Sequence, residues 1–348
     1  MRIFATVVLL LSASLAAAQG VGVSDCSHLA FGADVSFLAQ AQAQGTVFKD
    51  DGKPADGLEI LRRHGYGWVR LRLFNAPKTL PNNLAYTMAE AKKAKSMGFG
   101  LLLDLHYSDD WADPSHQITP ADWQKLKHKQ LVDAVHTFTR DSVAAFRDAD
   151  TMPDMVQVGN EITSGMLWPD GKLPDNWENF TDLLRAGVQG VKDGAGAAKA
   201  PLIMLHIDQG GNREATQWFF SRVLAAKVPF DVIGQSYYPW WQGSLLDLAH
   251  NLDFMAKTFR KPIIVVETAY SWRPDNYTKK PGPYPETKEG QREFLAALAN
   301  VVAATPGSLG RGVFWWEPAV RGPLARRGLF DDDGNSLPAL HVFDACVQ

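Results

Sequence analysis

The sequence predicts a single (β/α)8 barrel, and three observations lead to this fold class. Eight short apolar runs recur along the chain, and the segments between them are long enough for a helix. The runs are almost continuously apolar, as at residues 263–266, which is typical of parallel strands buried on both faces. An open doubly wound sheet is the alternative, but no Gly-x-Gly-x-x-Gly follows the first run and there is no P-loop. A length of 348 residues fits one such barrel.

The predicted elements alternate in the order that a barrel requires. Helical periodicity marks several of the segments between the apolar runs, and Gly98 follows a lysine-rich stretch as a typical helix end. We find no internal repeat, low-complexity tract or proline- and serine-rich linker, so one domain is the simplest organisation. The predicted strands are 29–36, 68–74, 99–107, 155–162, 202–208, 232–238, 262–270 and 313–318. The predicted helices are 57–64, 87–97, 124–147, 244–259 and 287–304.

The N-terminus has the features of a secretory signal peptide. Its first two residues give a short basic start, residues 3–16 are nearly all apolar, and alanines at 16–18 supply a cleavage pattern. A membrane anchor is the alternative, but the apolar run is shorter than the roughly 20 residues that a spanning helix needs. We therefore expect a signal peptide over 1–18 and an exported barrel domain over 19–348.

Composition excludes several classes of protein. Hydrophobic residues make up 46% and charged residues 21% of the chain, which excludes wholesale disorder. A net charge of −3 and a pI near 6.3 argue against a nucleic-acid binder. No later stretch is long and apolar enough to span a membrane, so we expect no membrane contact once the signal peptide is removed.

The two cysteines lie near opposite ends of the expected mature chain. They are too few for a cysteine-rich zinc module or a disulfide scaffold. In an oxidising compartment Cys26 and Cys346 could pair, provided that the ends of the chain are neighbours, as they are when the first and last strands of a barrel touch. Two unpaired thiols remain the alternative.

Polar residues gather at the C-terminal ends of the predicted strands, where the chemistry of a (β/α)8 barrel is located. Residues i and i+2 share one face of a strand, so Arg70 with Arg72 and Asp104 with His106 would point into the barrel. Burying so many charges is costly unless they pair. The alternative to a functional site is a buried ion-pair network that only closes the barrel mouth.

Two glutamates stand out as candidates for catalysis. Glu161 and Glu267 each end a strongly apolar run, on the fourth and seventh predicted strands, which face each other across the barrel top. Two carboxyl groups across a cleft are what glycoside hydrolysis needs. Asn160 is one residue out of phase with Glu161, so a bulge or a strand end must turn one of the two inward.

Tryptophan is abundant on the same predicted face. The chain has 11 tryptophans, and seven of them lie at or just after a predicted strand end. Flat rings with a polar edge suit the faces of sugars, although ordinary packing explains some of them. The seven are Trp111, Trp168, Trp240, Trp241, Trp272, Trp315 and Trp316.

Several strings of residues resemble the arabinogalactan endo-β-1,4-galactanases, glycoside hydrolase family 53. The resemblance runs in order over nearly the whole of 19–348, and its most specific part is the string after the third strand. The Asn-Glu and Glu pair on strands four and seven is shared by a whole clan of barrel glycosidases. The strings are LDLHYSDDWADP at 103–114, VGNEI at 158–162, GMLWP at 165–169, SYYP at 236–239, VVET at 265–268 and WEPA at 316–319.

The resemblance implies a retaining mechanism with Glu161 as general acid/base and Glu267 as nucleophile. It further implies that Arg70 and Tyr238 (or Tyr237) contact Glu267 and keep it ionised, at a lowered pKa, whereas the pKa of Glu161 is raised. The two carboxyl groups should then lie about 5–5.5 Å apart. The residues expected to bind substrate are Asn160 (at the sugar 2-hydroxyl), Arg70, Asp104, His106, Asp109, Trp111, Trp168, Tyr237, Tyr238 and Trp316 (as the floor under the sugar).

No cofactor or metal is implied. The segment 271–285, where some members of the family bind calcium, offers few carboxylates here. The stretch 331–335 resembles a calcium loop, but it lacks the later glutamate and is better explained as an Asp-Gly turn. Asn179 and Asn276 begin glycosylation acceptors that matter only in a eukaryote.

The sequence therefore predicts a secreted, endo-acting hydrolase of the β-1,4-galactan side chains of pectin. We expect a polysaccharide substrate, no nucleic-acid partner and a monomer. One alternative keeps the chemistry and changes the sugar to another β-glycan such as mannan or cellulose. The other is a sugar-binding barrel without catalysis, which the presence of both glutamates disfavours.

Overall fold

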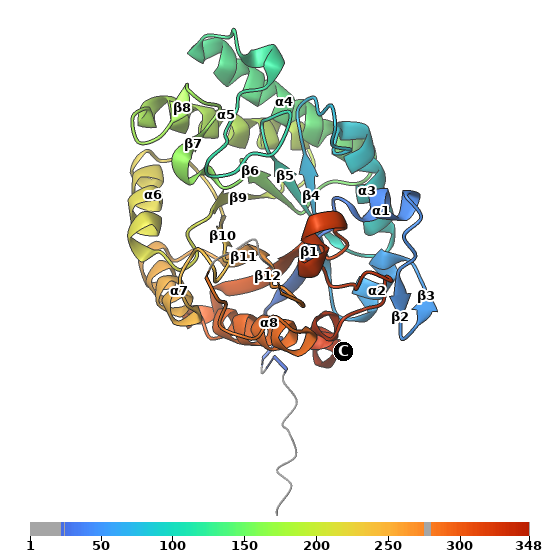
Figure 1. Cartoon of the computed structure of the whole chain (residues 1–348). Coiled ribbons are helices and arrows are strands. Elements are labelled where there is room, and N and C mark those ends of the chain that lie inside the picture. The colour runs from blue at the N-terminus through green and yellow to red at the C-terminus, as the bar shows by residue number, and fades with distance from the viewer. Residues whose placement is uncertain (1–21, 24, 275–279, 348) are drawn as a thin grey trace, which may run out of the picture.

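A computed structural model describes residues 22–23, 25–274 and 280–347. Within these residues eight parallel strands close a barrel in the order β1-β12-β11-β10-β9-β6-β5-β4, and helices surround it, so the predicted fold is confirmed (Figure 1). The expected signal peptide over 1–18 and the acceptor at Asn276 lie outside the described residues.

Each predicted strand overlaps one strand of the barrel, and only the last one misses its start, since β12 begins at Gly310 and not at residue 313. The apolar runs become strands because both faces are covered, one by the helices and one by the barrel interior. The strands are β1 (Ala30–Asp34), β4 (Trp68–Leu73), β5 (Gly100–Leu105), β6 (Met155–Val158), β9 (Leu202–Ile207), β10 (Val232–Ser236), β11 (Ile263–Thr268) and β12 (Gly310–Trp316).

The five predicted helices correspond to α2, α3, α4, α7 and α8, and periodicity alone did not identify α1, α5 and α6. Glycines weaken the helical signal of α5, but they let it lie close to α4. A Cβ on Gly190 would stand 2.7 Å from the His136 carbonyl oxygen. The helices are α1 (Leu38–Ala43), α2 (Gly57–Arg63), α3 (Leu84–Ser96), α4 (His128–Asp148), α5 (Trp177–Ala195), α6 (Arg213–Ala225), α7 (Leu245–Phe259) and α8 (Lys288–Ala303).

Short strands and 3-10 helices lie outside the barrel strands and the main helices. The hairpin of β2 (Lys49–Asp50) and β3 (Lys53–Pro54) packs outside α2, and η4 (Gly322–Arg327) follows β12 over the barrel mouth (Figure 1). The turn at 331–335 is held by Asp331, whose Oδ1 accepts from the backbone N–H groups of Asp333 and Asn335. The remaining elements are β7 (Gly165–Met166), β8 (Gly171–Lys172), η1 (Ala121–Trp123), η2 (Ile162–Ser164), η3 (Pro306–Ser308) and η5 (Pro338–Cys346).

The barrel interior has two layers. The lower layer is an apolar cluster, and on β5, β6 and β9 the next inward position is polar. On β5, for example, Leu102 belongs to the lower layer and Asp104 to the upper one. The lower layer consists of Leu102, Met155, Met204, Val232, Ile264, Val266 and Phe314.

The two ends of the described chain meet. Strand β1 pairs with β12 as well as with β4, which closes the barrel. Cys26 and Cys346 form a disulfide with their Cα atoms 5.6 Å apart, which ties η5 to the segment before β1. In the part of the chain that the structure describes, no helix has the length and apolar character needed to cross a membrane.

Candidate active site

Arg70 is the centre of the polar upper layer. Its side chain is fully buried on β4, and its guanidinium contacts three carboxylates, Asp34 at 2.9 Å, Asp104 at 2.8 Å and Glu267 at 3.0 Å. It also donates to the Asn160 side-chain oxygen at 2.7 Å. The predicted inward pairing of charges is therefore present, and Arg70 compensates the burial of three acids.

Arg72 continues this network toward the barrel mouth. It pairs with the buried Glu317 and lies 3.7 Å from Asp34. Its guanidinium carbon is 4.5 Å from the ring centre of Trp111 and 4.7 Å from that of Phe37, so the cation contacts both aromatic faces. Arg72 thereby fixes the position of two rings beside the cleft.

Glu161 reaches the site through a turn in the backbone. Strand β6 ends at Val158, Gly159 has φ 84°, and Glu161 itself has φ 48°, a left-handed conformation that is unusual for a residue with a side chain. This change of direction brings both Asn160 and Glu161 inward, which resolves the phase problem in the sequence. Non-glycine residues in this conformation are often found at functional sites.

Glu161 has few partners for a buried acid. Ser236 donates from Oγ to Glu161 Oε1 at 2.6 Å. Burial raises the pKa of Glu161 well above its ordinary value, and the negative charges of Glu267 and Asp208 raise it further, as predicted. The group is therefore suited to hold a proton.

Glu267 is held on both oxygens. Tyr238 donates from its hydroxyl to Oε1 at 2.9 Å, and Arg70 donates to Oε2 at 3.0 Å. The expectation of a lowered pKa is wrong, because burial raises the pKa of Glu267 by more than Arg70 and Tyr238 lower it. These two partners act on Glu267 far more than on Glu161, so Glu267 ionises first.

His206 lies close to both acids and was not identified from the sequence. Its Nδ1 is 3.0 Å from the Asn160 side-chain oxygen and its Nε2 is 2.8 Å from Ser236 Oγ. Burial, followed by the Arg70 charge, lowers its pKa well below the ordinary value, so the ring is neutral. The neutral ring adds no charge near the two acids, and it orients Asn160 and Ser236 through these contacts.

One oxygen of Glu161 and one of Glu267 lie within 4.8 Å of each other, and His206 offers a nitrogen within the same distance. Such a trio has the residue types of a metal site. Here both oxygens of Glu267 and both nitrogens of His206 are already engaged by protein groups. These hydrogen bonds make the trio part of the glutamate pair and its supporting network.

A cleft of about 680 Å³ opens above these residues. Of the residues predicted to bind substrate, five line it, whereas Arg70 and Asp104 are fully buried below and can only support it. Asp104 contacts His106 at 2.9 Å, and Arg70 lowers its pKa to about 2 despite the burial that opposes this. The predicted lining residues are Asn160, His106, Trp111, Tyr238 and Trp316.

Three predicted substrate residues lie elsewhere. Tyr237 points toward α8, where it stacks on Phe294 and donates to a backbone carbonyl, because it lies on the opposite face from Tyr238. Asp109 accepts from the backbone N–H groups of Ala76 and Ala121 and so joins two loops. Trp168 is not among the residues that line the cleft, and its indole N–H donates to the Ser164 carbonyl.

The structure adds lining residues that the sequence reasoning missed. Asp208, which was not named as a site residue, follows β9 at the cleft. Trp241, one of the seven tryptophans expected on this face but not among the expected substrate residues, contributes a half-exposed ring beside Tyr238, at a ring-centre distance of 5.4 Å. Asp34 supports Arg70 from the end of β1. Asp34, His206 and Asp208 all lie at strand ends, which is the signal that could have identified them.

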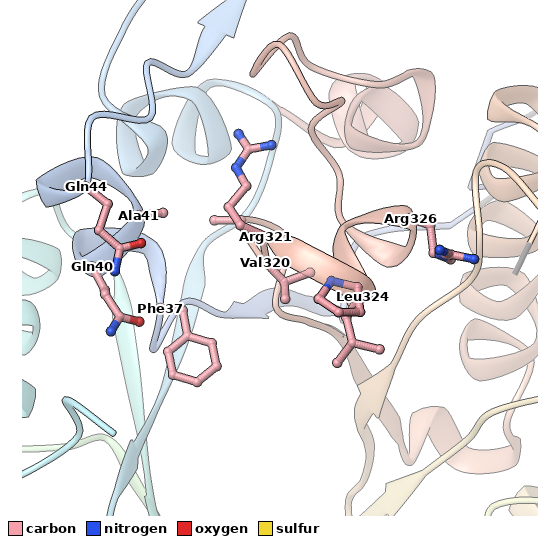
Figure 2. Close-up of a pocket in the computed structure, with 10 residues that line it drawn as sticks. Phe37, Gln40, Ala41, Gln44, Val320, Arg321, Leu324 and Arg326 are labelled. Atoms are coloured by element: carbon pink, nitrogen blue, oxygen red, sulfur yellow. The ribbon is translucent and has the colours of Figure 1, made fainter. Parts of the chain in front are cut away.

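A second hollow, of about 850 Å³, lies beside the cleft. Figure 2 shows Phe37 and Gln40 on one side of it and Arg321 and Leu324 on the other. Leu324 lines both spaces, and the Phe37 ring meets the Trp111 ring edge-on at 5.8 Å. The hollow is therefore next to the cleft and shares its wall.

Comparisons with known proteins agree with this geometry. The model of glycosyl hydrolase family 53 matches residues 30–343. An arabinogalactan endo-beta-1,4-galactanase of Thermothelomyces thermophilus is 36% identical over 329 residues, covering 90% of this chain and 98% of that protein. One of Cellvibrio japonicus is 33% identical and covers 96% and 95%. A solved structure of fungal beta-1,4-galactanases superposes with a TM-score of 0.85 at 34% identity, covering 91% and 99%.

Proposed function

The chain belongs to glycosyl hydrolase family 53 and is a glycoside hydrolase, and we propose that it is a secreted, endo-acting β-1,4-galactanase with a retaining mechanism. Its substrate would be the galactan side chains of pectin. The relatives at 33–36% identity named as arabinogalactan endo-beta-1,4-galactanases support the choice of sugar. The apolar leader at 1–18 supports export.

The observation that carries the mechanism is the unequal pair of glutamates. One oxygen of each lies within 4.8 Å of one of the other, and this closeness favours the roughly 5–5.5 Å between the carboxyl groups of retaining enzymes over the 6.5–9.5 Å of inverting ones. Arg70 and Tyr238 favour the ionised form of Glu267, whereas burial and neighbouring negative charge keep Glu161 protonated. One group is thus a nucleophile and the other an acid.

In the first step the Glu267 carboxylate attacks the anomeric carbon while Glu161 gives its proton to the departing glycosidic oxygen. A bond from sugar to Glu267 forms and the glycosidic bond breaks. In the second step the Glu161 carboxylate takes a proton from water, whose oxygen displaces Glu267 from the anomeric carbon. The two inversions leave the configuration unchanged.

Asn160 is positioned to bind the reacting sugar. Its side-chain oxygen accepts from Arg70, and its Nδ2 donates to the Ala112 carbonyl at 2.8 Å. The amide has a second N–H, and because Asn160 lines the cleft this N–H can donate to the sugar 2-hydroxyl. Trp316 and Trp111, whose ring centres are 6.3 Å apart, offer flat surfaces for the sugar faces.

The open cleft and the hollow in Figure 2 support endo action, because a chain can extend past the catalytic glutamates. Further galactosyl units would lie between Phe37 and Leu324. An exo-acting enzyme would need a wall that closes one end of the cleft.

The test is a reducing-sugar assay of the purified chain on linear β-1,4-galactan, with β-mannan and carboxymethylcellulose in parallel. We expect activity on galactan alone, with rapid loss of viscosity and ¹H NMR signals of the β-anomer first. Activity only on another β-glycan would refute galactan as the substrate. Release of the α-anomer first would refute the retaining mechanism. No activity on any of the three polysaccharides would favour a sugar-binding protein. Intact-mass measurement of the exported chain, expected to begin at residue 19, tests the signal peptide.

A further inference from the structure

A cluster of histidines and aspartates lies outside the active site. It brings together Asp50 of β2, His64 at the end of α2, and His341 of η5. Helix α2 leads into the N-terminal end of β4, so His64 lies toward the barrel end opposite the cleft. One donor atom from each of the three residues lies within 4.8 Å of the others, and the side chains of Asp50 and His64 are only 11% and 12% exposed.

Asp344 orients both imidazole rings in the same way. Its Oδ1 is 2.6 Å from His64 Nδ1, and its Oδ2 is 3.2 Å from His341 Nδ1. Both Nε2 atoms are therefore left for the other side of the cluster. A carboxylate that holds one ring nitrogen while the other nitrogen binds metal is the usual outer partner of a metal-ligating histidine.

The two Nε2 atoms face oxygen donors. His64 Nε2 is 3.1 Å from Asp50 Oδ1, and His341 Nε2 is 3.3 Å from Ser336 Oγ, which is itself 3.5 Å from Asp50 Oδ1. Tetrahedral zinc with bonds of about 2.0–2.2 Å needs donors about 3.3–3.5 Å apart. These separations are already close to that geometry.

Carboxylate oxygens surround His64. Asp344 contacts its Nδ1, and Asp50 contacts its Nε2. Arg63 contacts Asp50 Oδ2 at 2.8 Å, so Oδ1 is the Asp50 oxygen that faces His64.

We propose that Asp50, His64 and His341 form a zinc site, with Oδ1 and the two Nε2 atoms as ligands. Ser336 Oγ or a water molecule completes the tetrahedron, and Asp344 is the outer partner of both rings. The ion joins the β2–β3 hairpin, α2 and η5 outside the catalytic machinery. The disulfide at Cys346, two residues after Asp344, holds η5 in place and so preorganises the ligands.

The test uses the full mature chain without a histidine tag, treated with EDTA and dialysed. Isothermal titration with Zn²⁺ should give one equivalent, released protons in buffers of different ionisation enthalpy, and a higher unfolding temperature. His341→Asn should abolish the binding and the thermal shift. Asp344→Asn should weaken the affinity about 10–100-fold, the usual effect of losing an outer partner. Ca²⁺, which prefers oxygen donors, should not bind.

His136→Asn is the matched control, because His136 also contacts a single aspartate, at 2.8 Å, but has no second imidazole beside it. It should bind zinc like the parent. Failure of the parent to bind zinc, an unchanged equivalent in His341→Asn, or equal binding of Ca²⁺ would overturn the proposal. If His64→Asn does not fold, His341→Asn decides, since that side chain is 31% exposed on a terminal segment.

Discussion

The two layers of the barrel interior differ sharply in chemistry on strands that contribute to both. A step of two residues leads from Leu102 to Asp104 on β5 and from Met204 to His206 on β9. The lower layer contains side chains of one apolar cluster, and the upper layer contains Arg70, Arg72 and the acids that surround them. Strand alternation fixes the direction of each side chain, and it leaves the choice between stability and chemistry to the residue placed there.

This difference indicates what the upper layer costs. Burial of an apolar side chain stabilises a fold by roughly 1.5–3 kcal/mol, whereas a buried ion pair often contributes no more than apolar residues of the same volume would. The raised pKa values of Glu161 and Glu267 mean that ionising either group inside the fold costs free energy, chiefly through desolvation. The lower layer and the core between strands and helices contribute the stability that offsets the cost of burying these ionisable groups.

The largest expected effects separate the layers directly. Glu267→Gln should reduce the rate on galactan at least about 10⁴-fold, as loss of a catalytic nucleophile does, while the free energy of unfolding stays equal or rises because a buried charge is removed. Phe314→Ala, its counterpart in the lower layer, should cost about 3–5 kcal/mol of stability and leave the rate per folded molecule unchanged. Urea unfolding and initial rates measure both quantities. Two variants that lose activity and stability in the same proportion would contradict the separation.

Glu161→Gln should reduce the rate on galactan about 10²–10⁴-fold, the usual contribution of a general acid. Because the proton is needed by the leaving oxygen, the loss should be much smaller in the first step for a dinitrophenyl galactobioside, whose leaving group needs no proton. Burst kinetics on the two substrates measure the difference. An equal loss on both would assign Glu161 to positioning and not to proton transfer.

Matched conservative changes on one strand test how well each layer tolerates substitution. Asp104→Asn removes one charge from the Arg70 network and should cost about 3–5 kcal/mol, as breaking a buried pair does. Leu102→Met, two residues earlier, conserves volume and should cost less than about 1.5 kcal/mol. Urea unfolding at neutral pH compares them.

The pH dependence of the stability lost in Asp104→Asn tests whether the charge of Asp104 is responsible for it. The pKa of Asp104 is lowered to about 2 in the folded chain, so its contribution is present above its ordinary pKa and lost as the pH falls through about 2. The cost of Asp104→Asn should therefore shrink in acid, whereas that of Leu102→Met should not. If both costs follow the same pH course, the charge is not the reason for the difference.

Apolar runs predicted the strands because burial on both faces leaves little freedom in sequence. Helical periodicity did not predict α5. Its glycines allow close contact with α4, and such a contact between two helices cannot be seen in the sequence of one helix. Both glutamates were found from their place at strand ends. Asp34 and His206 obey the same rule and were missed, because their partners lie on neighbouring strands: β1 lies beside β4, and β9 lies between β6 and β10.

Two details of the site depend on geometry that alternation does not contain. The register between β10 and β11 shifts after Gln235, so the sequence left open which of Tyr237 and Tyr238 faces Glu267. The pKa of Glu267 was expected to be lowered from its arginine partner alone. How far burial outweighs that partner depends on how completely the loops cover the carboxyl group, which is a property of the folded chain.

The smallest expected effect tests the boundary between support and chemistry. Ser236 ends β10 in the upper layer, and its hydroxyl donates to Glu161 Oε1, which lowers the pKa of Glu161 against the effect of burial. Activity requires protonated Glu161, so the alkaline limb of the pH–rate profile follows this pKa. Ser236→Ala should move that limb to higher pH by about 0.5–1 unit, the equivalent of one hydrogen bond, and leave the acid limb of Glu267 in place.

Ser142→Ala is the control for this shift, because Ser142 is also buried but lies in the middle of α4. It should leave both limbs unchanged. A shift of the Ser236→Ala alkaline limb to lower pH would mean that the hydroxyl stabilises the protonated form of Glu161. A specific hydrogen bond from Ser236, and not burial, would then raise the pKa of Glu161. The upper layer would in that case differ from the lower layer in where individual hydrogen-bond donors are placed.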